Sequence, residues 1–311
     1  MLPARFVAES LGASVVWESK EPNKILIQKN LTEILFYIGS SIAYINDREV
    51  ILDSAPFIEK ERTYTPVRFI CESLGADVEW NDKTAEATIT PQDAVITEEK
   101  ATLASGKTFQ DLLYRPANAS EGLPLIVYPH GGSGKGNDLG ILTQNGGFPQ
   151  YLKDGKLKDI PAYILIPQLS APYTGWGSAR STVVELIRFV CDAYSMDTRR
   201  ISLTGHSMGG TGVWNVASAC PDMFSCIAPL SGSIQTKPET LSAFSSMPIY
   251  TVVGSADTIV PPDSSVEFIS ALQSDRAQIF VLEGATHFDV PSLAYLSNDF
   301  SLLRWLLSQS K

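Results

Sequence analysis

Positive charge, histidine and cysteine are scarce in this chain, and long hydrophobic runs are missing. Its 311 residues include 3 histidines and 4 cysteines, and 24 Lys and Arg against 34 Asp and Glu give a formal net charge of −10. This excess of negative charge argues against nucleic acid or an anionic membrane surface as a partner. No apolar run approaches the roughly 18–20 residues of a membrane-spanning helix, so we expect no membrane insertion.

The cysteines lack the spacing of a metal site. Cys71, Cys191, Cys220 and Cys226 form no C-x-x-C pair and no Cys/His cluster, so we expect neither a metal nor a cofactor. Cys220 and Cys226 could pair, and cysteine usage therefore leaves the redox compartment open. The first residues, MLPARFVAES, do not contain the apolar segment of a signal peptide.

What the chain does contain is an internal duplication near its start. LPARFVAESLGASVVW (2–17) aligns with TPVRFICESLGADVEW (65–80) at a constant offset of 63 residues. In each copy a proline opens an amphipathic helix, Leu-Gly ends it, and a short strand ending in tryptophan follows. The sequence predicts a small α+β repeat domain over residues 1–92.

This repeat resembles the copper amine oxidase N-terminal-like domain, a stalk found on many secreted bacterial proteins. The resemblance covers about residues 1–90 and is carried mainly by RTYTPVRFICESLGADVEW. It implies a spacer or cell-surface attachment module, and hence a secreted or surface-displayed bacterial protein. The segment has no histidine, which argues against a copper role. Binding of carbohydrate or cell wall is the alternative function for this domain.

Short apolar runs alternate with amphipathic helical stretches from residue 93 to residue 311. The runs lie at 123–129, 162–167, 201–204, 226–230, 249–253 and 278–282. They are continuous rather than alternating in polarity, which is typical of parallel strands covered on both faces. We therefore expect a doubly wound, mostly parallel α/β sheet over residues 93–311.

Four loops that follow these strands carry the side chains of a nucleophilic hydrolase. They read HGGSGKG, GHSMGG, GSADTIVPP and EGATHF. Functional groups of such sheets gather at the carboxyl ends of the strands. GHSMG matches G-x-S-x-G, a strained strand-to-helix turn that presents a serine at the N-terminus of a helix. Ser207 is therefore the predicted nucleophile.

A serine hydroxyl needs a base, and the base needs an orienting acid. Only His287 follows the last core strand, where the chain order Ser…Asp…His requires the base. We expect His130 and His206 to hold their loops by hydrogen bonds. Asp257 is the first carboxylate after the strand at 249–253 and is the predicted acid.

Two other aspartates compete with this choice. Asp263 follows two prolines and is typical of a helix N-cap, and Asp289 lies two residues beyond the predicted base.

The intermediate of acyl transfer needs preorganised donors for its oxyanion. The N–H groups of Met208, directly after the nucleophile, and of Gly132 in HGGSG are the predicted donors. Gly131 and Trp176 are expected to line the substrate cleft. A phosphate-binding loop is a poorer interpretation of GGSGKG, because the spacing of G-x-x-x-x-G-K-[ST] is absent.

Residues from about 100 to 311 resemble the α/β-hydrolase superfamily, in particular its predicted peptidase and phospholipase/carboxylesterase group, close to dienelactone hydrolase. YPHGGSGKGND, DTRRISLTGHSMGGTGVW and PDMFSCIAPLSG carry this resemblance. It implies a serine carboxylesterase that forms an acyl-serine intermediate, with Ser207, Asp257 and His287 in the matching positions. The expected substrate is a small-molecule or polymer-linked ester.

The domain has no obvious long insertion that could form a lid, which suits soluble or short-acyl esters. A serine peptidase with the same three residues is one alternative function. A non-catalytic surface binding protein with a vestigial hydrolase fold is another.

Overall fold

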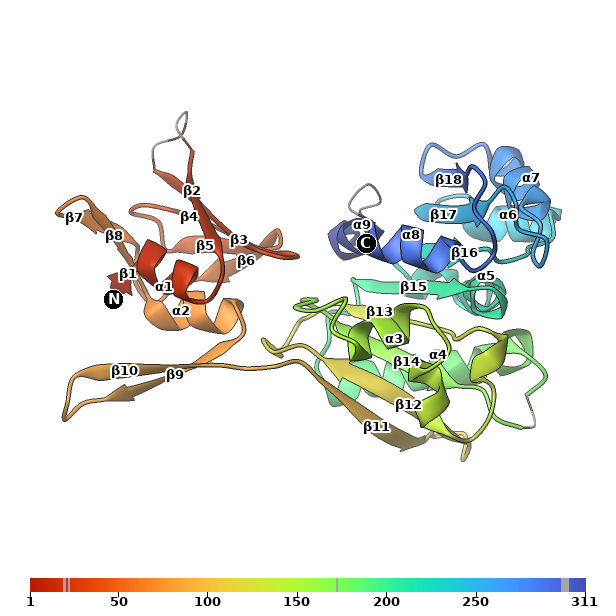
Figure 1. Ribbon diagram of the computed structural model, residues 1–311, viewed down its shortest axis with the longest axis horizontal. Helices are drawn as coiled ribbons and strands as arrows, with labels where there is room; N and C mark the ends of the chain where they lie inside the picture. The colour runs from red at the N-terminus through yellow and green to blue at the C-terminus, as the bar shows by residue number, and fades with distance from the viewer. Residues whose placement is uncertain (19–20, 22, 172, 298–301) are drawn as a thin grey trace. The chain divides into compact units, whose positions relative to one another are not determined.

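The computed structural model describes residues 1–18, 21, 23–171, 173–297 and 302–311. The chain divides into two compact units (Figure 1). The N-terminal unit is Met1–Val95 with Arg115–Ser120 and Asp159–Pro161, and the C-terminal unit is Ile96–Tyr114, Glu121–Lys158 and Ala162–Lys311. Among the described residues, no helix is both long and apolar enough to cross a membrane.

Antiparallel strands and two short helices make up the N-terminal unit. One sheet has the order β2 (Ser14–Trp17), β3 (Lys24–Lys29), β4 (Thr32–Tyr37), β5 (Ile42–Ile45) and β6 (Arg48–Ile51). A second has the order β1 (Leu2–Pro3), β8 (Arg62–Thr65) and β7 (Phe57–Glu59), and β9 (Ala76–Asn81) pairs with β10 (Glu86–Pro91) as a hairpin. The helices α1 (Ala4–Ser10) and α2 (Val67–Ser73) share one apolar core with β3, β4 and β9.

The duplicated sequence folds twice into the same helix–strand unit. α1 begins directly after Pro3 and α2 directly after Pro66. Gly12 and Gly75 follow the two helices, each with φ of +80°. Only glycine adopts this left-handed conformation without strain, so the Leu-Gly pair ends each helix as the sequence predicts.

The C-terminal unit is built on one eight-stranded sheet. Its order is β11 (Val95–Thr102), β12 (Thr108–Arg115), β14 (Tyr163–Gln168), β13 (Leu125–Val127), β15 (Ile201–His206), β16 (Cys226–Leu230), β17 (Ile249–Gly254) and β18 (Ala277–Leu282). The strands from β14 through β13 to β18 are parallel, and β12 pairs antiparallel to β14. The predicted mostly parallel α/β sheet is therefore confirmed. The boundary expected after residue 92 lies between β10 and β11 and stays a prediction.

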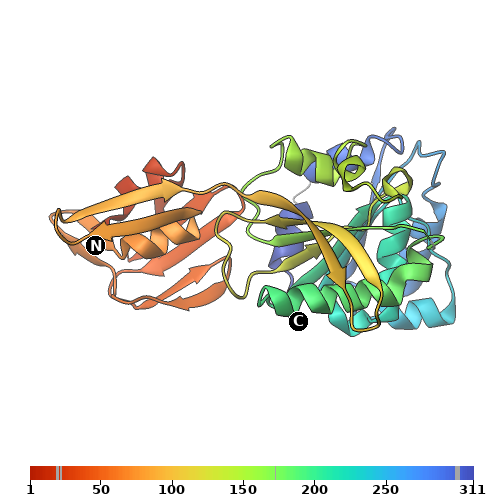
Figure 2. The same cartoon turned by 90° about the horizontal axis from the view of Figure 1, so that it is seen from below.

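Helices cover both faces of this sheet (Figure 2). They are α3 (Phe148–Lys153), α4 (Trp176–Ala193), α5 (Met208–Ala219), α6 (Pro238–Phe244), α7 (Asp263–Leu272), α8 (Val290–Leu296) and α9 (Leu302–Ser308). Successive side chains of a strand point to opposite faces. Ile227 of β16 accordingly joins the large core with residues of α4 to α7, whereas the sulfur of Cys226 lies 3.9 Å from the Leu306 carbonyl of α9. On the neighbouring strand β15, the Thr204 hydroxyl lies 2.6 Å from the Tyr295 hydroxyl of α8.

Candidate active site

Ser207 stands at the tip of a tight turn between β15 and α5. Its φ of 62° and ψ of −124° place it in a conformation that non-glycine residues seldom adopt. Its N–H donates to the Leu230 carbonyl at 3.0 Å. A Cβ at Gly205 would lie 2.7 Å from the Pro129 carbonyl oxygen, and one at Gly209 would lie 2.1 Å from the same atom. The two glycines of G-x-S-x-G are therefore required because strand, turn and helix touch through bare backbone.

His287 and Asp257 form a buried hydrogen-bonded pair. Nδ1 of His287 lies 2.7 Å from Oδ2 of Asp257, and both residues are 4% exposed. Oδ1 of Asp257 accepts the N–H groups of Ile259 at 2.9 Å and Val260 at 2.8 Å. Burial alone would raise the pKa of Asp257, but the hydrogen bonds from Val260, His287 and Ile259 outweigh it and lower the pKa below its usual value. The carboxyl group is thus held ionised beside the imidazole.

The structure selects Asp257 over both rival aspartates as the partner of His287. Asp263 is the first residue of α7. Oδ2 of Asp289 accepts the N–H of Thr286 at 2.9 Å and its hydroxyl at 2.6 Å, which closes the local turn. The turn formed by Asp289 supports the loop that carries His287 without contacting the imidazole nitrogens.

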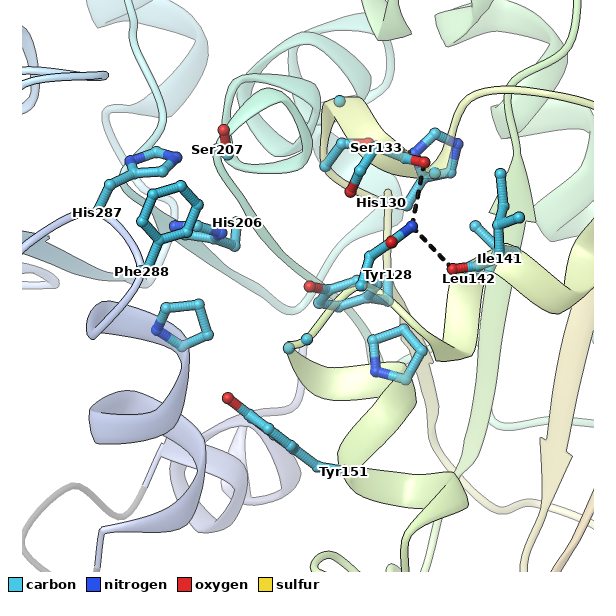
Figure 3. A pocket seen from close by; sticks show the side chains of 18 of the residues that line it. Tyr128, His130, Ser133, Ile141, Leu142, Tyr151, His206, Ser207, His287 and Phe288 are labelled. Carbon is cyan, nitrogen blue, oxygen red and sulfur yellow. Dashed lines mark hydrogen bonds between the residues drawn. The ribbon is translucent and has the colours of Figure 1, made fainter.

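Ser207 and His287 line the same pocket, and the imidazole is directed toward the serine (Figure 3). No hydrogen bond joins the two side chains in the described part of the chain. Hydrogen bonds between a nucleophile and its base are often longer without substrate and tighten when it binds. The pocket therefore brings together a strained serine and an oriented imidazole, which is what nucleophilic catalysis requires.

The glycine-rich loop after β13 lies against Ser207. A Cβ at Gly131 would lie 4.0 Å from Cβ of Ser207, and Gly132 begins a short 3₁₀ helix, η1 (Gly132–Gly134). Met208 is the first residue of α5, so its N–H has no partner within the helix. Gly131 and Gly132 both line the pocket. The structure thus places the predicted oxyanion donors on the two segments that meet at Ser207.

His130 holds the glycine-rich loop, as the sequence predicts. Its Nδ1 lies 2.6 Å from the Gly131 carbonyl oxygen, and its Nε2 accepts the N–H of Leu169 at 3.0 Å. Burial lowers the pKa of His130 to about 4, so the ring is neutral near pH 7. With both nitrogens engaged, His130 is not available as a base.

Trp176 does not line the pocket, contrary to the sequence-based expectation. It is the first residue of α4, is 2% exposed, and donates its indole N–H to the His130 carbonyl at 3.0 Å. A Cβ at Gly212 would lie 2.5 Å from the indole. The indole therefore packs between the glycine-rich loop and α5, and it supports the backbone that forms the pocket.

His206 packs on the candidate base. The two ring centroids, of His206 and His287, are 4.4 Å apart, and Nε2 of His206 is buried without a hydrogen-bond partner among the described residues. Burial, together with the neighbouring charge of His287, lowers the pKa of His206 to about 4. His206 is therefore a neutral ring that packs against the candidate base at a tilt of 43°. A hydrogen bond to the backbone of His287 partly offsets this lowering of the pKa of His206.

The pocket has a volume of about 430 Å³. The sequence analysis did not predict the apolar side chains that line it. These are Tyr128, Ile141, Leu142, Pro149, Tyr151, Ile259, Phe288 and Pro291. Two of them had a readable signal, because Ile259 and Phe288 follow the predicted acid and base within two residues. Pro291 lies in α8, and the others lie in the long connection between β13 and β14, where nothing in the sequence shows which side chains face the serine.

The two units match two family models. Residues 1–97 match the Copper amine oxidase N-terminal domain, and residues 178–293 match the Dienelactone hydrolase family. The chain therefore carries a copper amine oxidase N-terminal domain followed by a dienelactone hydrolase-type α/β-hydrolase domain. A search of the curated proteins found no match.

Solved structures share the fold. A thermostable esterase has a TM-score of 0.56 at 18% identity, covering 96% of this chain and 76% of that one. A mutant feruloyl esterase module from Clostridium thermocellum, complexed with sinapinate, has a TM-score of 0.52 at 17% identity over 70% and 87%. An S-formylglutathione hydrolase from Agrobacterium tumefaciens has a TM-score of 0.51 at 14% identity over 71% and 98%. At such identities the likeness shows the fold alone.

The N-terminal domain does not fit the metal in its family's name. Copper is bound in proteins mainly by imidazole and sulfur ligands. Residues 1–97 contain no histidine, and their single cysteine, Cys71, is completely buried. Among the described residues, no group of three His, Cys, Asp or Glu could hold a metal ion.

The tight turn at Ser207 predicts that alanine substitutions at two helical glycines differ strongly in their effect on activity and stability. Gly209→Ala should lower activity at least about 100-fold or destabilise the C-terminal unit by about 2 kcal/mol or more, because its Cβ meets the Pro129 carbonyl. Gly177→Ala in α4 is the control, since its nearest contact would be an ordinary 3.4 Å. Ester turnover and urea unfolding measure both variants. Equal effects of the two substitutions would contradict the assigned role of the turn.

The two buried neutral histidines predict a pH dependence of stability. Their folded pKa values of about 4 lie below the usual 6.5, so the unfolded chain binds more protons between these limits. Stability should therefore fall as the pH decreases from about 6.5 to about 4, by up to ~1.4 kcal/mol per pH unit for each histidine. Urea unfolding at several pH values tests this. His206→Gln should flatten the dependence, and an unchanged slope in that variant would count against a neutral His206.

Proposed function

We propose that the C-terminal domain is a serine carboxylesterase that acts through an acyl-Ser207 intermediate. The observation that carries the proposal is the 2.7 Å pair of His287 and Asp257, which points the imidazole into a pocket that also holds the strained Ser207. The match of residues 178–293 to the Dienelactone hydrolase family and the esterase folds among the solved structures support the same class of chemistry.

In this mechanism His287 takes the proton of the Ser207 hydroxyl as its oxygen attacks the ester carbonyl carbon. The carbonyl oxygen becomes an oxyanion, which accepts the N–H groups of Met208 and Gly132. When the C–O bond to the alcohol breaks, His287 returns the proton to the leaving oxygen. Water, deprotonated by the same imidazole, then attacks the acyl-enzyme, and the acid product leaves with Ser207 restored.

Asp257 contributes to each of these steps through orientation and charge. Its bond to Nδ1 fixes the tautomer in which Nε2 is free to accept the serine proton. Because Ile259 and Val260 donate to its other oxygen, the carboxylate cannot rotate away when the imidazole becomes charged. The low pKa of Asp257 keeps this negative charge in place to stabilise the imidazolium.

We expect hydrolysis of p-nitrophenyl acetate and butyrate by the full chain. Ser207→Ala should lose at least about 10³-fold in kcat, and Asp257→Asn should lose a similar factor because the imidazole takes the wrong tautomer. Labelling of Ser207 by a fluorophosphonate probe provides an independent measurement. Activity retained in Ser207→Ala would overturn the proposal.

The same experiment separates the other functions that this site allows. Turnover of peptide amides without turnover of esters would identify a serine peptidase. Absence of both turnover and labelling, in a chain that is folded, would identify a binding protein with a vestigial hydrolase fold.

For the N-terminal domain we propose a spacer or attachment role on a secreted or surface-displayed bacterial protein. Trp17 and Trp80 occupy equivalent positions in the two copies and are 37% and 57% exposed. A tryptophan left exposed at the same place twice is typical of a surface that meets a partner.

Attachment predicts that the full chain binds isolated bacterial cell walls. The variant with both Trp17→Ala and Trp80→Ala should lose at least about tenfold in bound fraction, because the aromatic surface is removed, while its ester turnover stays the same. Sedimentation with cell-wall fragments measures the bound fraction. Equal sedimentation of both proteins would count against attachment through these side chains and leave the spacer role.

A further inference from the structure

The described side chains that line the active-site pocket are apolar or neutral polar groups and three histidines, of which His130 and His206 are neutral. None of the described residues that line it is an Asp, Glu, Lys or Arg. Asp257 lies behind His287, with its side chain fully covered. A carboxylate on the substrate would meet no cation in this pocket, while the chain as a whole carries a net charge of −10. Such a group would lose its hydration and gain no partner.

Two large apolar side chains are left exposed at the mouth of this pocket. Phe288 is 76% exposed and Ile259 is 55% exposed. The Phe288 ring stands edge-on to the imidazole of His287, with 5.5 Å between the centroids. Figure 3 shows Phe288 beside His287 and His206. Tyr128 and Tyr151 lie elsewhere around the same pocket.

These side chains belong to the loops that carry the acid and the base. Phe288 follows His287 directly, and Ile259 lies two residues after Asp257. Exposed apolar surface at this place costs free energy unless a ligand covers it. A group that covers both side chains also removes water from the His287–Asp257 pair, and hydrogen bonds of charged groups strengthen in a drier surrounding.

We propose that the pocket selects esters whose bound group is neutral and apolar, about as large as a six-carbon chain or one ring, and that Phe288 and Ile259 cover this group. The inference rests on the proposed esterase function and names its substrate class. The volume of about 430 Å³ is in the lower part of the range for small-molecule pockets, which fits a group of this size.

A matched pair of substrates tests the charge selection. p-Nitrophenyl hexanoate and mono-p-nitrophenyl adipate have acyl chains of equal length, and only the second ends in a carboxylate. We expect kcat/KM of the full chain to be at least about 100-fold lower for the adipate, with Ser207→Ala as the blank for spontaneous hydrolysis. Equal turnover of the two esters overturns the proposal while leaving the esterase function intact. If neither ester is turned over, the esterase function itself has failed.

A cationic ester completes the series, because aromatic faces also attract cations. The p-nitrophenyl ester of 6-(trimethylammonio)hexanoic acid should be a poorer substrate than the hexanoate. Faster turnover of this ester would replace the neutral class by a cationic one.

Substitution of the two side chains tests their part in the selection. Burial of a methylene group favours binding by about fourfold, so kcat/KM should rise steeply from acetate through butyrate to hexanoate. In the Phe288→Ala, Ile259→Ala double variant the hexanoate-to-acetate ratio should fall at least about tenfold, and Phe288→Leu should retain most of it. Phe189→Ala is the matched control, because Phe189 is 47% exposed on α4 and lies outside the pocket lining.

The ratio also separates selection from loss of the fold. All four proteins should unfold at the same urea concentration, since the substituted side chains are exposed. An unchanged hexanoate-to-acetate ratio in a folded double variant would show that Phe288 and Ile259 do not cover the substrate.

Discussion

The candidate site depends on one steric constraint, the contact of bare backbone at the turn that carries Ser207. Gly205 and Gly209 leave no room for a Cβ because the Pro129 carbonyl occupies that space. The contact brings the loop after β13 against Ser207, so that a Cβ at Gly131 would lie 4.0 Å from the Cβ of Ser207. The proposed nucleophile and oxyanion donors are thereby assembled from two strands by packing alone, before any substrate binds.

Environment gives the three histidines different parts. His130 is buried with both ring nitrogens hydrogen-bonded, so it stabilises the conformation of the glycine-rich loop. His206 is buried against His287 and neutral, and a charge on it would oppose the charge that His287 takes up in the proposed mechanism. Only His287 has an anchored carboxylate on one nitrogen and a pocket at the other. Residue type alone does not distinguish the three histidines, because the role of each ring depends on its hydrogen-bond partners.

Much of this was predictable from the sequence, for reasons that differ between elements. The strands β13 to β17 are buried on both faces of the sheet, and their sequences are therefore continuously apolar, which makes them recognisable. The pairing of Asp257 with His287 followed from strand order, because both lie in loops at the carboxyl edge. Trp176 was placed wrongly because its position depends on Gly212, a contact between two helices that no local pattern records. The strands β11 and β12 went unnamed for another reason, because β11 is largely exposed and polar, and the apolar side chains of β12 are interrupted by Gln110 and Asp111.

Placing the substrate-covering residues beside the catalytic ones has a consequence for how the site works. Phe288 shares a peptide bond with His287, and the N–H of Ile259 holds the carboxylate of Asp257. A bound apolar group that presses on these two side chains therefore presses on the backbone that positions the acid and the base. Binding energy from a part of the substrate that does not react can then appear in kcat as well as in KM, which is how remote contacts contribute to catalysis. A charged group gains less of this energy, because the free energy needed to remove its hydration opposes the burial of Phe288 and Ile259.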